Sequence, residues 1–124
     1  MTIITEDYVS FEIAKLLKEK GFDGRCRAHY GTASSFCYKR FEVEAYEMHN
    51  AILAPTIQMA MKWLRDVHNI DIIAPPQYDG VKWTYSAIIF KLSIPCTEIR
   101  LNDNKNKKEE SIEAAIKYCL EYLI

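Results

Sequence analysis

The chain has 124 residues, of which 49% are hydrophobic and 27% are charged, and its formal net charge is −1. This length fits a single globular domain over residues 1–124 with one core, and the apolar fraction excludes an intrinsically disordered chain. The near-zero net charge excludes a general attraction to polyanions, which needs a surplus of lysine and arginine.

The sequence contains no long apolar run and no basic, apolar leader. No stretch of 18 apolar residues occurs, so no membrane span is predicted. The first residues, MTIITEDY, differ from a secretory signal, which indicates a cytoplasmic protein. In that compartment we expect reduced thiols at all four cysteines, which are Cys26, Cys37, Cys96 and Cys119.

The first predicted helix covers residues 10–21. Ser10 is a favourable N-cap, and Gly21 followed by Phe22 is typical of a helix end. Residues 24–50 are less regular, although 26–30 and 36–41 can form two strands. The first of these strands would separate two sets of side chains, with Cys26, Ala28 and Tyr30 on one face and Arg27 and His29 on the other.

Residues 41–50 alternate like a strand but also contain good helix formers, and both interpretations stay open. An irregular stretch of this length is often functional, so the region 24–50 is a candidate for a variable, partner-specific surface.

A helix over 56–68 follows. Pro55 suits a first helical position, Thr56 is a possible N-cap, and Asn69 can end the helix after His68. Its apolar stripe consists of Ile57, Ala60, Met61, Leu64 and Val67.

The next stretch predicts a hairpin between residues 70–74 and 81–92, with a turn at Asp79-Gly80. From 81 to 87 apolar and polar residues alternate, with Val81, Trp83, Tyr85 and Ala87 against Lys82, Thr84 and Ser86. Ala87 to Phe90 are apolar on both faces, which indicates a strand that is covered twice or bulged. Residues 97–101 can form a third strand.

The last predicted helix, 110–123, has the most regular stripe, made of Ile112, Ala115, Ile116, Cys119, Leu120 and Leu123. We therefore expect this helix to belong to the core. Three amphipathic helices and several neighbouring antiparallel strands indicate an α+β fold, in which a small antiparallel sheet packs against the helices as a two-layer or α/β/α sandwich.

Three segments carry a resemblance to a known family: VSFEIAKLLKEKGFD at 9–23, APTIQMAMKWLRDVHNI at 54–70 and EAAIKYCLEYLI at 113–124. They resemble small phage- and prophage-encoded proteins of gut anaerobes, a phage α/β sandwich domain family. The resemblance implies a sandwich fold and a cytoplasmic place of action. It implies no activity, cofactor or catalytic residue.

Metal and catalytic chemistry have weak signals. Four residues could supply metal ligands, Cys26, His29, Cys37 and His49, but their spacing is not that of a zinc site. A buried Cys26 and a surface His29 are the simpler interpretation. His68 fits a helix C-terminus better than a catalytic site, and Glu42, Glu44 and Glu47 fit a solvated face better than a carboxylate pair. No catalytic, cofactor or metal residue is therefore assigned.

Two kinds of binding remain. Residues 55–124 follow the order helix, strand, strand, strand, helix, which is that of a double-stranded RNA-binding domain, and Lys105, Lys107 and Lys108 precede the last helix. Acidic neighbours weaken that alternative, and element order alone is an analogy. The leading hypothesis is a non-enzymatic accessory protein that binds a host or phage protein. Such a protein should expose a contiguous apolar or aromatic patch. A small enzyme is the third hypothesis.

Overall fold

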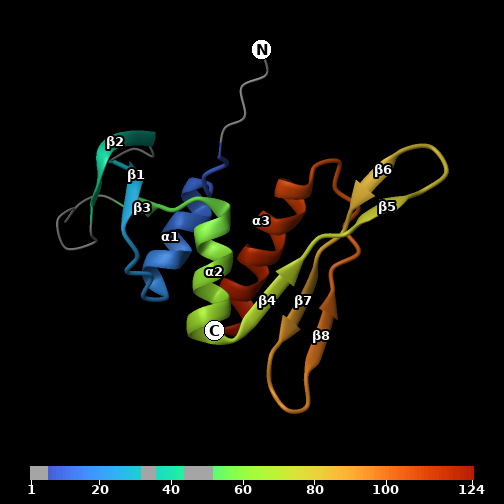
Figure 1. Cartoon of the computed structure of the whole chain (residues 1–124). Helices are drawn as coiled ribbons and strands as arrows, with labels where there is room; N and C mark the ends of the chain where they lie inside the picture. Colours follow the sequence, from blue (N-terminus) through green and yellow to red (C-terminus); the bar gives the residue numbers. More distant parts are fainter. Residues whose placement is uncertain (1–5, 32–35, 44–51) are drawn as a thin grey trace. The chain divides into compact units, whose positions relative to one another are not determined.

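The computed structural model describes residues 6–31, 36–43 and 52–124 (Figure 1). The chain divides into two compact units, Met1–Ala60 and Met61–Ile124. Helices and small antiparallel sheets make up the described parts, so the predicted α+β class is confirmed. The single domain over 1–124 stays a prediction. None of the helices in the described ranges has the length and apolarity that crossing a bilayer requires.

Helix α1 (Phe11–Glu19) is defined by its caps. The Ser10 hydroxyl oxygen accepts a hydrogen bond from the backbone N–H of Ile13 at 3.4 Å. At the other end Gly21 adopts a φ of 89°, and the Phe22 N–H donates to the carbonyl oxygen five residues earlier at 2.9 Å. These are the helix start and helix end that the sequence predicts. Helix α1 packs against strand β3.

Strand β1 (Cys26–Tyr30) lies between β2 (Phe36–Val43) and β3 (Ile52–Ala54) in an antiparallel sheet. Both predicted strands are confirmed. The prediction that His29 is a surface residue is wrong, because His29 is buried. The pairing with β2 shifts register between Cys26 and Ala28, which breaks the simple alternation of faces. The undecided stretch beyond β2, residues 44–51, lies outside the described residues.

Helix α2 (Ile57–His68) begins one residue after its cap. Thr56 Oγ1 accepts the Met59 N–H at 3.2 Å, so Thr56 is the N-cap and Pro55 precedes it rather than opening the helix. Asn69 has a φ of 56° and ends the helix as predicted. Val67 was expected in the apolar stripe but is 58% exposed, because at 3.6 residues per turn it lies about 80° from Ile57 around the helix.

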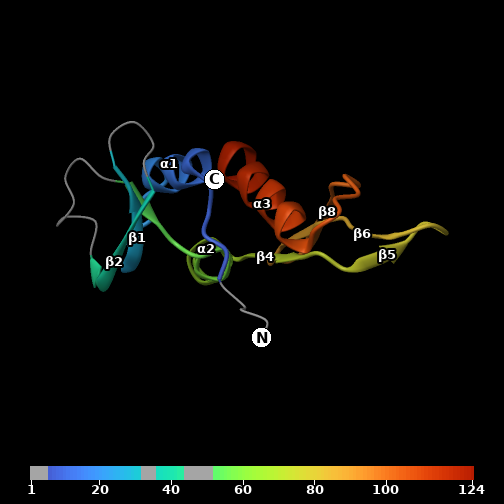
Figure 2. The same ribbon diagram turned by 90° about the horizontal axis from the view of Figure 1, so that it is seen from above.

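In the second unit β4 (Ile70–Ile73), β7 (Ile88–Lys91) and β8 (Thr97–Arg100) form an antiparallel sheet in that order. A separate two-stranded sheet joins β5 (Pro76–Tyr78) to β6 (Trp83–Tyr85). The predicted hairpin is confirmed, but the strand expected over 81–92 is interrupted at 86–87. Figures 1 and 2 show the β5–β6 hairpin extending beyond the ends of β4 and β7.

Helix α3 (Lys108–Tyr118) continues into η3 (Cys119–Leu123), five residues of wider π-helical turn. It begins two residues earlier than predicted and contacts β4 and β6. The predicted stripe is buried except at Leu123, which is half-buried; the buried residues are Ile112, Ala115, Ile116, Cys119 and Leu120. The expectation that this helix belongs to the core of its unit is therefore confirmed.

Candidate functional site

Two aromatic rings are exposed on the β5–β6 hairpin. Tyr78 and Trp83 face each other across the two strands, with ring centroids 5.2 Å apart and planes tilted by 48°. Their exposed fractions are 59% and 60%, and that of Val81 in the connecting turn is 87%. We call these three residues the aromatic arm. The aromatic arm is an apolar surface held by main-chain pairing rather than an isolated exposed side chain.

The turn between the two strands is closed by Asp79. Its N–H donates to the Lys82 carbonyl oxygen at 3.1 Å, and its Oδ1 accepts the Val81 and Lys82 N–H groups, both at 2.8 Å. The backbone N–H groups of Lys82 and then Val81 lower the pKa of the Asp79 carboxyl, because they stabilise the charged form. Gly80 supplies the left-handed φ of 97°. The predicted turn is therefore confirmed, and it fixes the separation of the two aromatic rings.

The opposite face of β6 is polar, and it is buried. Thr84 and Ser86 are 4% and 3% exposed, although the alternating pattern suggests that polar residues face solvent. The loop before α3 pairs along the edge of the strand, where Lys105 and Tyr85 exchange two backbone hydrogen bonds of 2.8 Å, and Asn104 bonds the Ser86 hydroxyl. Helix α3 also contacts β6. The hydroxyl face is thus the buried one, and the aromatic face of the strand is left in solvent.

The three lysines predicted for nucleic-acid contact lie in the loop before α3 and at the start of that helix. The Lys105 backbone is paired with β6, while Lys107 is the N-cap residue of α3 and Lys108 its first residue. The structure adds Lys82, whose Nζ donates to Asn106 Oδ1 at 3.1 Å. The loop and the hairpin are therefore also tethered through side chains.

The charges around the hairpin cancel. Residues 76–85 and 102–110 contain four lysines, Lys82, Lys105, Lys107 and Lys108, and four acids, Asp79, Asp103, Glu109 and Glu110, so four minus four gives zero. A backbone-binding surface for nucleic acid needs a local surplus of cations. The hairpin surface is neutral and aromatic instead.

His68 lies at the end of α2 with its ring edge against Trp63, at a centroid distance of 4.7 Å. Its Nε2 is buried and has no hydrogen-bond partner among the described residues. The two neighbouring carboxylates make other contacts: Asp66 lies 3.6 Å from Arg65, and Asp71 Oδ1 accepts the Ile72 N–H at 3.1 Å. The ring of His68 is therefore in contact with an aromatic side chain, that of Trp63.

The possible metal ligands are only partly described. His29 and Cys37 are paired residues of β1 and β2, with Cys37 exposed, and His49 lies outside the described residues. Over the ranges that the structure describes, no three His, Cys, Asp or Glu side chains gather as a metal site. Of the three glutamates, Glu42 is in β2, whereas Glu44 and Glu47 are not described.

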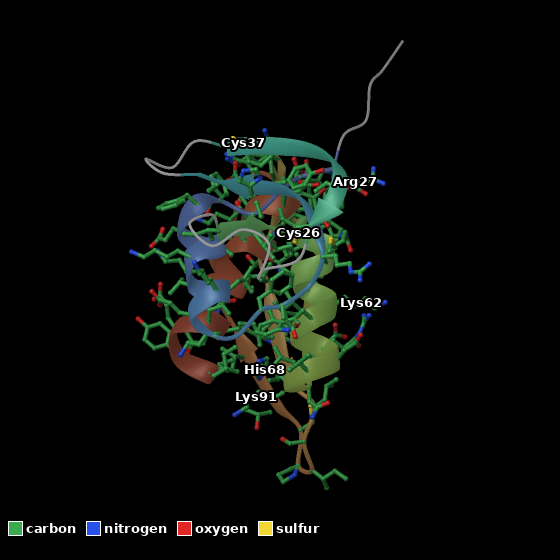
Figure 3. The ribbon with its side chains drawn as sticks, turned by 90° about the vertical axis from the view of Figure 1, so that its left-hand side faces the viewer. Cys26, Arg27, Cys37, Lys62, His68 and Lys91 are labelled. Atoms are coloured by element: carbon green, nitrogen blue, oxygen red, sulfur yellow. The ribbon has the colours of Figure 1, made fainter. Side chains whose placement is uncertain are left out.

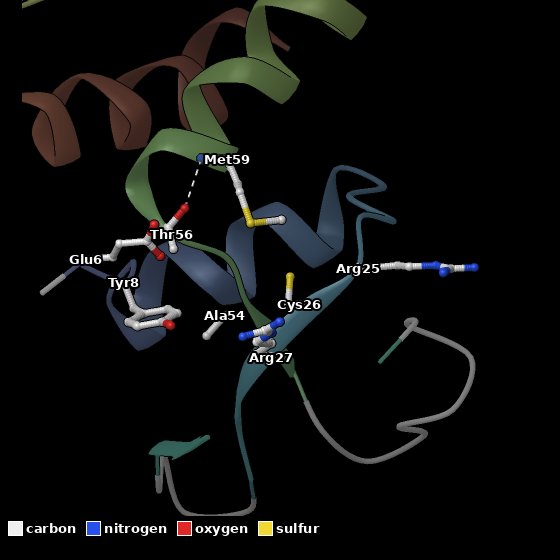
Figure 4. A pocket seen from close by; sticks show the side chains of 8 residues that line it. All are labelled: Glu6, Tyr8, Arg25, Cys26, Arg27, Ala54, Thr56 and Met59. Atoms are coloured by element: carbon white, nitrogen blue, oxygen red, sulfur yellow. Dashed lines mark hydrogen bonds between the residues drawn. The ribbon is translucent and has the colours of Figure 1, made fainter. Parts of the chain in front are cut away.

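The first unit contains a pocket of about 270 Å³ (Figure 4). It is lined by residues from the segment before α1, from the start of β1 and from the junction of β3 and α2. These are Glu6, Tyr8, Arg25, Cys26, Arg27, Ala54, Thr56 and Met59. Sequence reasoning missed this pocket, because its walls come from three separated segments. The only signal available was the pair of arginines that flank Cys26.

Comparison of the chain with protein-family models, with curated proteins and with solved structures gave no match. The functional argument therefore depends on the aromatic arm and on the outer edge of strand β8.

Proposed function

We propose that this chain is a non-enzymatic binding protein whose aromatic arm docks onto an apolar surface of a protein partner. One observation carries the proposal, the outward orientation of the aromatic face of β6. Tyr78, Val81 and Trp83 leave large apolar side chains in solvent while two hydroxyl residues occupy the buried face. Burial of such side chains is the main favourable term in association, so their exposure disfavours the free chain and favours a complex.

The chemistry of the arm favours protein over nucleic acid. Trp and Tyr are enriched among the residues that contribute most to protein interfaces, since they bring large area at low entropic cost. Nucleic-acid binding also uses exposed aromatics but requires cations in surplus, and the charges around the hairpin sum to zero. Nucleic acid therefore remains the alternative. In the setting that the family resemblance implies, the partner is a host or phage protein.

The test compares two double variants that remove similar exposed apolar area. Tyr78→Ser with Trp83→Ser removes the arm, and Val67→Ser with Tyr122→Ser is the matched control, because Val67 and Tyr122 are exposed on helices away from the hairpin. Each tagged protein is incubated with lysate from cells that carry its gene, and retained proteins are quantified by mass spectrometry. The strongest candidate is then purified and titrated.

We expect a partner that the wild type and the control bind with equal affinity and that the arm variant binds at least about tenfold more weakly. Equal binding by all three proteins would place the interface elsewhere and contradict the proposal. A parallel titration uses labelled single- and double-stranded RNA and DNA. Salt-dependent binding that disappears in the arm variant would favour the nucleic-acid alternative instead.

A further inference from the structure

We propose that strand β8 pairs with the β8 of a second copy of this chain, so that two three-stranded sheets join into one antiparallel sheet of six strands. In this pairing Ile99 of one copy lies opposite Ile99 of the other, and Glu98 of each copy lies opposite Arg100 of the other. These residues are distinct from those of the aromatic arm, so the inference is independent of the proposed function.

Strand β8 forms one side of its sheet. The central strand is β7, whose last residue, Lys91 (Figure 3), is paired with Ile70 of β4 and with Thr97 of β8. Among the residues that the structure describes, β8 pairs with β7 alone (Figure 1). Its sequence, TEIR, contains neither proline nor lysine, two residues with which natural sheet edges commonly avoid further pairing. Its outer side is therefore able to accept another strand.

The hydrogen bonds to β7 determine which backbone groups of β8 face outward. The Leu101 N–H donates to the Ala87 carbonyl oxygen at 3.1 Å, and hydrogen-bonded pairs alternate along an antiparallel ladder. Leu101 and Ile99 therefore direct their backbone groups toward β7. Glu98 and Arg100 direct theirs away from it, toward the place of the second copy.

The opposite edge of the sheet, at β4, is different. The Leu92 N–H donates to the Asn69 carbonyl oxygen at 2.8 Å, so by the same alternation Asp71 faces β7 and Ile72 faces outward. The Ile72 N–H is already bound by Asp71 Oδ1 at 3.1 Å. Strand β8 is thus the edge better suited to pairing.

The charges on β8 favour a second copy as the occupant. Glu98 and Arg100 form an ion pair on one face of the strand, with side chains that are 40% and 59% exposed. An antiparallel pairing centred on Ile99 places each of these charges directly opposite its counter-charge, twice by symmetry. The two neighbouring registers would place glutamate opposite glutamate or arginine opposite arginine, which is destabilising. The edge is therefore complementary to itself in the proposed register.

Backbone and apolar contacts add to the charges. Each of the two pairs of Glu98 with Arg100 exchanges two backbone hydrogen bonds, which makes four. Half-buried Ile99 ends a row that begins with buried Ile72 and Ile89, and at the two-fold axis it would meet its counterpart at a non-hydrogen-bonded position, where side chains approach most closely. Because four residues make a small interface, we expect a weak dimer with a Kd on the order of 100 µM.

The test is sedimentation velocity of the full chain from about 10 µM to about 1 mM, which brackets that Kd. Glu98→Arg places arginine opposite arginine, and Arg100→Glu places glutamate opposite glutamate. Each change should weaken the dimer at least about tenfold. The double variant that exchanges the two residues restores opposite charges and should dimerise like the wild type. An equimolar mixture of the two single variants should form a heterodimer for the same reason.

Two controls locate the interface. Asp66→Arg makes the same change of charge at an exposed position of α2 and should leave the Kd unchanged. Tyr78→Ser with Trp83→Ser should also leave it unchanged, because the aromatic arm lies outside this edge. Circular dichroism shows whether each variant is folded. A wild type that stays monomeric at about 1 mM, or a dimer lost in either control, would overturn the proposal.

Amide hydrogen exchange then tests the backbone pairing itself. The N–H groups of Glu98 and Arg100 should exchange at least about tenfold more slowly at dimer-forming concentrations than in dilute solution, because pairing gives them acceptors. The same comparison in Glu98→Arg should show no such slowing. Equal exchange of these two amides at both concentrations in the wild type would show that dimerisation does not use the edge of β8.

Discussion

Ser86 and Asn104 are joined by two hydrogen bonds, from the Ser86 hydroxyl to Asn104 Oδ1 at 2.9 Å and from the Asn104 N–H to Ser86 Oγ at 3.0 Å. The two residues are 18 positions apart in sequence. Their contact ties the loop before α3 to the residue just after β6, the strand that carries Trp83. Ser86 is buried whereas Trp83 is exposed, so this polar contact is made by a residue that does not share the exposure of the aromatic arm.

The first prediction concerns this contact. Ser86→Ala should lower the free energy of unfolding by about 1 kcal/mol, because it removes the acceptor of the Asn104 N–H and the donor to Asn104 Oδ1 in a part-buried contact. Ser93→Ala is the control, since Ser93 is exposed and its hydroxyl donates only to the Pro95 carbonyl oxygen at 2.9 Å. The control should stay within about 0.5 kcal/mol. Urea titration followed by circular dichroism measures both, and equal losses would contradict the assigned role of Ser86.

The second prediction tests which face of β6 is buried. The same new residue is placed at adjacent positions, Trp83→Asp and Thr84→Asp. Thr84 is buried, so a carboxylate there should cost several kcal/mol of stability, whereas Trp83→Asp should cost about 1 kcal/mol or less. Thermal melting of both variants decides the matter. If Trp83→Asp were the more damaging change, the apolar face would point inward, as the alternating pattern alone suggests.

The third prediction concerns α3. Ile116 is fully buried, so Ile116→Ala should cost about 2–5 kcal/mol through lost burial and the cavity that remains. Val67→Ala, a change of an exposed β-branched residue on another helix, should cost under about 0.5 kcal/mol. A chain that ends at Glu110 lacks the whole stripe and should lose cooperative melting. A near-normal melting midpoint of that shortened chain would show α3 to be dispensable for folding.

The fourth prediction links Cys119 to alkaline pH. Burial raises the pKa of its thiol from 9.0 to about 12. Between these values the unfolded chain loses the thiol proton while the folded chain keeps it, so the free energy of unfolding falls as pH rises, by up to about 1.4 kcal/mol per pH unit. Cys119→Ala removes the thiol and its protonation change, so its free energy of unfolding should decline less steeply over the same range. Identical slopes would show that the thiol does not contribute.

Helix boundaries could be predicted from sequence because capping is local chemistry. Ser10 and Thr56 accept N–H groups three residues ahead, and Gly21 and Asn69 adopt the left-handed conformation, so each signal and its effect lie within one turn. The last residue of the apolar stripe predicted for α2, Val67, was wrong by one position. The buried face continues from Leu64 toward half-buried His68 rather than to exposed Val67, since helical neighbours along one face are four residues apart as often as three.

The orientation of β6 could not be predicted in the same way. Alternation divides residues 81–87 into two faces and suggests that the polar face meets solvent, whereas the structure buries Thr84 and Ser86 and exposes Trp83. The partners of this segment are Asn104, which bonds the Ser86 hydroxyl, and Lys105, which pairs with Tyr85, and both lie in the loop between β8 and α3. The pocket was missed for a related reason, because Tyr8, Arg27 and Met59 come together only when the sheet and α2 are in place. Local patterns predicted the elements, and nonlocal contacts decided both candidate sites.

The hairpin has a buried hydroxyl side and an exposed aromatic side. This division affects how the sequence can evolve. In the proposed binding role, substitutions at Tyr78, Val81 and Trp83 would alter what the arm recognises, while Thr84 and Ser86 would continue to anchor it. Specificity and foldability would then depend on different residues of one short segment. A lineage could exchange one partner for another by a few mutations in this hairpin, without passing through an unstable ancestor.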